Sequence, residues 1–152
     1  MRILILAFLS VCFLYSCKPG AGKASEELSK DPKVLEDQLM AIHDEVMPKL
    51  TDMQNLGGQL RKIREATPEN SAGKIVPPDG LDQTADALKL AEQGMWDWMK
   101  QYHDQRDSIP ADQLLPFLTH QMELLKSVQN GVNTSIGKAT EWLKANSTPN
   151  AK

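Results

Sequence analysis

Apolar side chains return every three or four positions along three long stretches of this chain, and this period constrains the fold more than any other feature. On a helix with 3.6 residues per turn, such spacing gathers the apolar side chains on one face. A helix with one apolar face must bury it, so the three faces are expected to cover one another. The three stripes are Leu35, Leu39, Ile42, Val46, Met53, Leu56, Leu60 and Ile63; Leu81, Ala85, Leu88, Ala91, Met95, Trp98 and Tyr102; and Leu114, Leu118, Met122, Leu125, Val128, Val132, Ile136, Ala139 and Leu143.

The residues between the stripes mark where the helices begin and end. Asp31 and Pro32 suit an N-cap and a first helical position, and the first helix should stop near Ala66 because a proline follows. Pro48 lies inside the first stripe, where we expect a kink rather than an end. The short link after the second stripe favours antiparallel neighbours. We therefore predict an all-α fold, an elongated antiparallel three-helix bundle of coiled-coil type over residues 31–145.

The first sixteen residues are typical of a secretory signal peptide, which is not part of the folded domain. A single charge at Arg2 precedes an apolar run that is shorter than the roughly twenty residues needed to span a bilayer. Residues 18–30 are rich in Gly, Ala, Ser, Lys and Glu and are typical of a flexible tether. Residues 146–152 are predicted to form a disordered tail.

The end of this signal carries a more specific pattern. Leu14-Tyr15-Ser16-Cys17 resembles the lipobox of bacterial lipoproteins, although Tyr15 is bulkier than the usual residue. The resemblance implies cleavage between Ser16 and Cys17 and a lipid on the Cys17 sulfur, followed by a tether over 17–30. The expected location is the bacterial cell envelope, anchored to the outer membrane in preference to the inner, with the bundle facing the periplasm or the exterior. The alternative is an ordinary signal peptide with an incidental cysteine.

Two internal blocks carry a second resemblance. MAIHDEVMPK at 40–49 and MWDWMK at 95–100 are similar to segments of small helical bacterial lipoproteins often labelled "viral A-type inclusion protein". That resemblance implies no activity and no catalytic residue, so it transfers no functional site to this chain.

Charge and motif content favour a function without catalysis. The formal charge is −3, from 17 basic and 20 acidic residues, and the basic residues are dispersed, so no nucleic-acid partner is expected. The sequence contains no nucleophile elbow, phosphate loop or zinc spacing. We predict a lipid-anchored protein that is not an enzyme, has no cofactor, and has a binding or structural role toward an unknown protein partner.

Methionine and histidine offer an alternative function. Met40, His43 and Met47 share one side of the first helix, and Met99 and His103 share a side of the second. A hairpin turning near position 73 would set His43 opposite His103 and Met47 opposite Met99. Thioether and imidazole ligands together favour Cu(I), so a copper site is the alternative prediction. Methionine is also a common filler of helical cores, which leaves a purely structural interpretation open.

Two nearby tryptophans require separate explanations. Trp96 and Trp98 lie about 200° apart around a helix, so both cannot occupy the same face. Trp98 continues the second stripe. For Trp96 we expect packing against the first helix, with a partner contact as the second interpretation because aromatic side chains often anchor interfaces.

Overall fold

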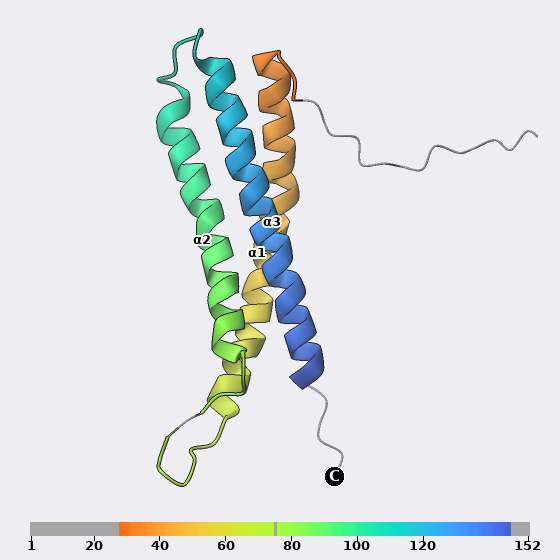
Figure 1. Ribbon diagram of the computed structural model, residues 1–152, viewed down its shortest axis with the longest axis vertical. Helices are drawn as coiled ribbons and strands as arrows, with labels where there is room; N and C mark the ends of the chain where they lie inside the picture. Colours follow the sequence, from red (N-terminus) through yellow and green to blue (C-terminus); the bar gives the residue numbers. More distant parts are fainter. Residues whose placement is uncertain (1–27, 75, 147–152) are drawn as a thin grey trace, which may run out of the picture.

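Three helices make up the fold: α1 (Pro32–Ala66), α2 (Leu81–Arg106) and α3 (Leu114–Asn146). The computed structural model describes residues 28–74 and 76–146. Figure 1 shows the helices side by side as one elongated bundle, with α2 antiparallel to both α1 and α3. The predicted all-α three-helix bundle is therefore confirmed. The predicted signal peptide, the Ser16–Cys17 cleavage site and positions 147–152 of the predicted tail lie outside the described residues.

The start of α1 is set by the predicted cap. The Asp31 carboxylate accepts a hydrogen bond from the Lys33 backbone N–H at 2.9 Å, and Pro32 occupies the first turn. An N-cap bond of this kind satisfies one of the backbone donors that a helix start leaves unpaired. The helix then continues through Pro48 to Ala66, so this proline does not end it.

The core runs along the whole bundle and follows the predicted stripes. It includes Leu50, which follows Lys49, the charged residue that interrupts the first stripe, and two polar side chains of α3, Gln121 and Ser135. Burying such side chains is the main favourable contribution to folding. The buried apolar residues are Leu35, Leu39, Val46, Leu50, Met53, Leu60, Leu81, Leu88, Met95, Trp98, Leu118, Met122, Leu125, Val132, Ala139 and Leu143.

The packed body extends slightly beyond the predicted bounds of 31 and 145. Leu28 belongs to the stretch predicted as tether, yet it packs against the core, and the Ser29 hydroxyl accepts a bond from the Asp31 N–H at 3.1 Å. At the other end, α3 includes Asn146, whose side-chain amide donates to the Trp142 carbonyl at 2.8 Å. The body therefore spans at least Leu28 to Asn146.

The connection from α1 to α2 closes against α3. Gly80 immediately precedes α2 with a φ of 78°, in the left-handed region that favours glycine. A Cβ built at this position would lie 3.3 Å from the Trp142 indole Nε1, and the same Nε1 donates to the Asp79 carbonyl at 2.8 Å. The loop is thus held to the end of α3, which limits how α2 can begin.

Candidate functional site

One histidine and one methionine of the predicted metal set are in contact. His43 of α1 places its Nε2 atom 3.2 Å from the Met99 sulfur of α2. His43 also lies beside Trp98, with ring centroids 6.0 Å apart. The structure therefore brings an imidazole nitrogen and a thioether sulfur together at the α1–α2 contact.

The other predicted donors are placed differently. Met40 and Met47 are half-buried and pack against the core, whereas His103 is exposed. The predicted register set His43 opposite His103, and this detail is wrong because His43 contacts Met99 instead. Within residues 28–74 and 76–146, no group of three or more His, Cys, Asp or Glu side chains is arranged to hold a metal.

The pairing of α1 with α2 departs from the predicted alignment by about one helical turn, and only along part of the hairpin. Near the α1–α2 loop, Gln54 donates to Glu92 at 2.9 Å and Arg64 pairs with Asp82, which matches the predicted alignment. Farther along the hairpin, the contact to Met99 comes from His43, one turn before the predicted Met47. Pro48 lies in this interval and removes one backbone hydrogen bond from α1.

The contact on the other side of the imidazole ring determines which nitrogen of His43 carries the proton when the ring is neutral. Its Nδ1 lies 2.9 Å from a carboxylate oxygen of Asp44, which can only accept a hydrogen bond when ionised. In the neutral ring, this arrangement places the proton on Nδ1 and leaves the Nε2 lone pair directed toward Met99. Carboxylate-oriented imidazoles of this kind are common among metal ligands. In the imidazolium form, Nε2–H would instead donate to the sulfur.

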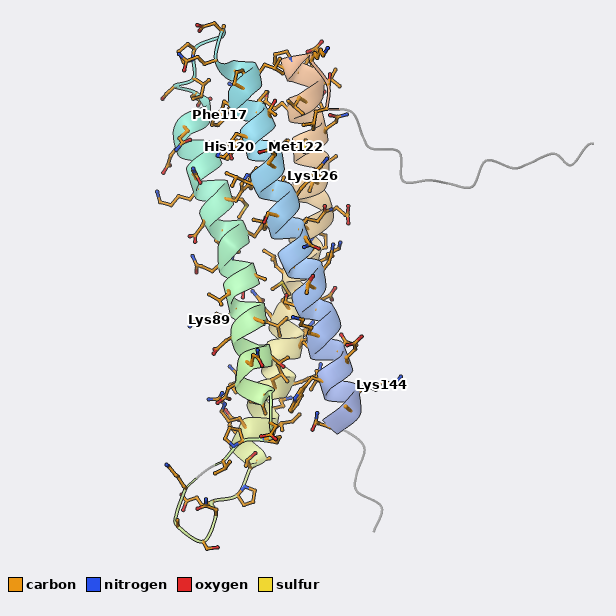
Figure 2. All side chains as sticks on the ribbon, viewed as in Figure 1. Lys89, Phe117, His120, Met122, Lys126 and Lys144 are labelled. Atoms are coloured by element: carbon orange, nitrogen blue, oxygen red, sulfur yellow. The ribbon has the colours of Figure 1, made fainter. Side chains whose placement is uncertain are left out.

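An aromatic stack extends from His43 across all three helices. Trp98 and Tyr102 stack with centroids 5.3 Å apart, and Tyr102 stacks on Phe117 of α3 at 5.9 Å. Figure 2 places Phe117 in the same half of the bundle as the α2–α3 link. Such pairs contribute roughly 0.5–1.5 kcal/mol beyond the area they bury.

A carboxylate that accepts three hydrogen bonds lies beside Tyr102 of this stack. Glu36 of α1 accepts from the Tyr102 hydroxyl at 2.6 Å and from two nitrogens of Arg106, Nε at 2.5 Å and Nη2 at 2.9 Å. The Arg106 hydrogen bond lowers the pKa of Glu36 despite partial burial. Burial and the Glu36 bond raise the pKa of Tyr102, and the same carboxylate raises the pKa of Arg106. Tyr102 therefore stays neutral and Glu36 stays ionised over the ordinary pH range.

The Glu36–Tyr102–Arg106 network and two buried polar atoms were not predicted from the sequence. Glu36 follows the first stripe residue directly, and the only available signal was a charge beside the apolar face. Within the described ranges, Trp98 Nε1 and Gln121 Oε1 are buried without a hydrogen-bond partner. Buried polar atoms of this kind are uncommon and mark places where a structure departs from a purely apolar core.

The two tryptophans differ as their spacing predicts. Trp98 is buried at 4% exposure, whereas Trp96 is 46% exposed. The expectation that Trp96 packs into the core against α1 is therefore wrong. The role of Trp96 as a partner contact stays a prediction.

Comparison with protein-family models, with curated proteins and with solved structures finds no match to this chain. None of the helices in the described ranges combines the length and the apolar character needed to cross a membrane. The resemblance to small helical lipoproteins accordingly stays a prediction.

Proposed function

We propose that this chain is a lipid-anchored helical module of the bacterial cell envelope, with a binding or structural role rather than a catalytic one. The observation that carries the proposal is the position of Cys17, which follows an apolar run and a small residue and precedes the folded body that includes Leu28. Eleven residue steps separate the two, so the acylated sulfur can lie at most about 40 Å from that body.

The proposed anchor at Cys17 turns one end of the bundle toward the membrane. α1 begins at the same end of the bundle as the link between α2 and α3 (Figure 1). A lipid on Cys17 holds that end near the bilayer. Each buried methylene of an acyl chain contributes about 0.8 kcal/mol to this attachment, and two or three chains make it stable.

Metabolic labelling with a clickable fatty-acid analogue tests the anchor. The full chain is expressed in bacteria, and labelling is compared between the native chain and the Cys17→Ser variant. Cys12→Ser is the matched control, because this cysteine lies within the predicted signal. We expect label on the native chain and on the control, and none on Cys17→Ser. Equal labelling of Cys17→Ser would refute the lipid anchor.

A second candidate function is Cu(I) binding, favoured by the contact between His43 and Met99. Their donor atoms are 3.2 Å apart and come from two helices, so one ion between them would need only a small separation of the side chains. The remaining thioether donors of the prediction are Met40 and Met47 on α1.

Competition with a Cu(I) chelator of known affinity tests this candidate. His43→Gln and Met99→Leu should each weaken binding at least about tenfold, while His103→Gln should leave it unchanged because that histidine is exposed. Binding that is lost with His103 but kept without His43 would contradict the site. A native chain that cannot compete with the chelator would remove the candidate altogether.

A further inference from the structure

A tryptophan ring borders the contact between His43 and Met99. The ring centroids of Trp98 and His43 are 6.0 Å apart, with 38° between the ring planes, and Trp98 directly precedes Met99 in α2. Trp98 is 4% exposed, so its indole lies on the core side of this contact. The imidazole nitrogen and the thioether sulfur therefore meet beside an aromatic ring that is shielded from water.

Packing holds this indole in one orientation. Tyr102, one turn farther along α2, stacks on it with centroids 5.3 Å apart and 21° between the ring planes. Tyr102 is itself held, because its hydroxyl donates to Glu36 at 2.6 Å and its ring stacks on Phe117. The indole N–H of Trp98 has no hydrogen-bond partner in the described part of the chain, so ring contacts orient it. A ring that is already ordered loses little entropy when an ion binds next to it.

An indole in this position can contribute to the binding of a cation. The face of an aromatic ring carries negative charge and attracts a cation within about 6 Å of the ring centroid, and tryptophan does so most strongly. The attraction grows where water is excluded. His43 stands at this distance from the indole, so a cation held between its Nε2 atom and the Met99 sulfur would meet Trp98 on the core side.

We propose that Trp98 completes the candidate Cu(I) site, with its indole as an aromatic wall against the ion that His43 and Met99 bind. The wall stabilises the single positive charge and keeps water from the core side of the ion. A soft monovalent ion suits this environment, since Zn²⁺ takes four nitrogen, sulfur or oxygen ligands and an indole face supplies none of them. This inference rests on the second candidate function, Cu(I) binding, and is independent of the lipid anchor.

Tryptophan fluorescence of the full chain in non-ionic detergent tests the contact between the ion and the indole. Both cysteines are replaced in every chain compared (Cys12→Ser and Cys17→Ser), because thiolates would compete for the ion. Cu(I), added under argon, should quench the emission until one ion is bound per chain. Trp98→Phe removes the reporter and should lose most of this quench. Met99→Leu keeps the reporter and should lose the quench as well, because the ion is no longer held beside the indole.

A distant tryptophan and a second metal provide the controls. Trp142 lies against Gly80, which is 19 residue steps from Met99 along the chain, or about 28 Å at 1.5 Å per residue. Trp142→Phe should therefore keep the quench. Zn²⁺ at the same concentration should not produce it. A quench that persists in Trp98→Phe, or that Zn²⁺ produces equally, would overturn the proposal.

Competition with a Cu(I) chelator measures how much the ring contributes to affinity. Affinity should fall from the native ring to Trp98→Phe and again to Trp98→Leu, with at least about a tenfold loss for leucine, which has no aromatic face. Leu88→Ala controls for lost packing, because it removes another buried side chain of α2 away from the site. It should leave the affinity within about twofold of the native value.

The outcomes separate this inference from the candidate function on which it rests. Equal affinities for the native ring, phenylalanine and leucine at position 98 would refute the aromatic wall and leave Cu(I) binding by His43 and Met99 in place. A chain with the native ring that binds no Cu(I) would remove the candidate function, and the aromatic wall with it.

Discussion

Replacing Glu36 by Gln tests how strongly the Glu36–Tyr102–Arg106 network joins α1 to α2. The native carboxylate accepts three hydrogen bonds, two of them from a guanidinium, and both charged side chains are 29% exposed. Hydrogen bonds to charged groups contribute roughly 1.5–3 kcal/mol each when well buried, and exposed ion pairs contribute less than about 1 kcal/mol. At this intermediate exposure, the substitution should lower the free energy of unfolding by about 2 kcal/mol.

Urea unfolding followed by circular dichroism measures this change. Glu65→Gln serves as the matched control, because Glu65 pairs with Arg61 on the same helix with both side chains largely exposed. It should cost less than about 0.5 kcal/mol. A double-mutant cycle with Arg106→Gln then isolates the pair. A coupling energy below about 0.5 kcal/mol, or equal effects at Glu36 and Glu65, would refute the reasoning.

The same network predicts how the contribution of Glu36 to stability changes with pH. Hydrogen bonding by Arg106 lowers the pKa of folded Glu36 below its ordinary value of 4.5. Its contribution to stability is therefore complete above that value and is lost as the pH falls through the lower folded pKa. The difference in unfolding free energy between the native chain and Glu36→Gln should be constant near pH 7 and shrink in acid. A difference that grows in acid would contradict the assignment.

Two further substitutions test the packing. Leu39→Ala removes a fully buried side chain and should lower the unfolding free energy by about 2–5 kcal/mol in urea titrations, far more than Val34→Ala at an exposed site of the same helix. Gly80→Ala forces a left-handed φ on a residue with a Cβ close to Trp142, so it should cost about 1–2 kcal/mol, whereas Gly137→Ala meets no neighbouring atom and should be neutral or stabilising. The reverse order within either pair would contradict the geometry.

Much of the fold could be predicted because its causes are local and repeated. The three-to-four period of α1 and α2 marks the buried face without knowledge of any contact. The start of α1 could be predicted for the same reason. Asp31 supplies the cap bond, and Pro32 directly after it has a ring that favours a helical φ. These features depend on the neighbouring sequence and on nothing distant.

The departures arise where distant residues decide the outcome. Lys49 interrupts the first stripe, and its ammonium donates to Glu45 at 2.7 Å and to Asn133 of α3 at 3.0 Å; the contact with α3 is one that no local pattern reveals. Gln121 is buried in the core although its side chain is polar, so the apolar period does not mark it. The alignment of His43 with Met99 depends on the whole α1–α2 hairpin, and a shift of one turn preserves the apolar stripe while changing every polar neighbour.

Because the bundle has three antiparallel helices, α1 begins at one end of it and α3 finishes at the opposite end (Figure 1). With 35 residues in α1, those ends are about 52 Å apart. With the proposed lipid on Cys17, the end of the bundle where α1 begins stays near the bilayer, so an upright bundle would carry the last turn of α3 about 52 Å farther out.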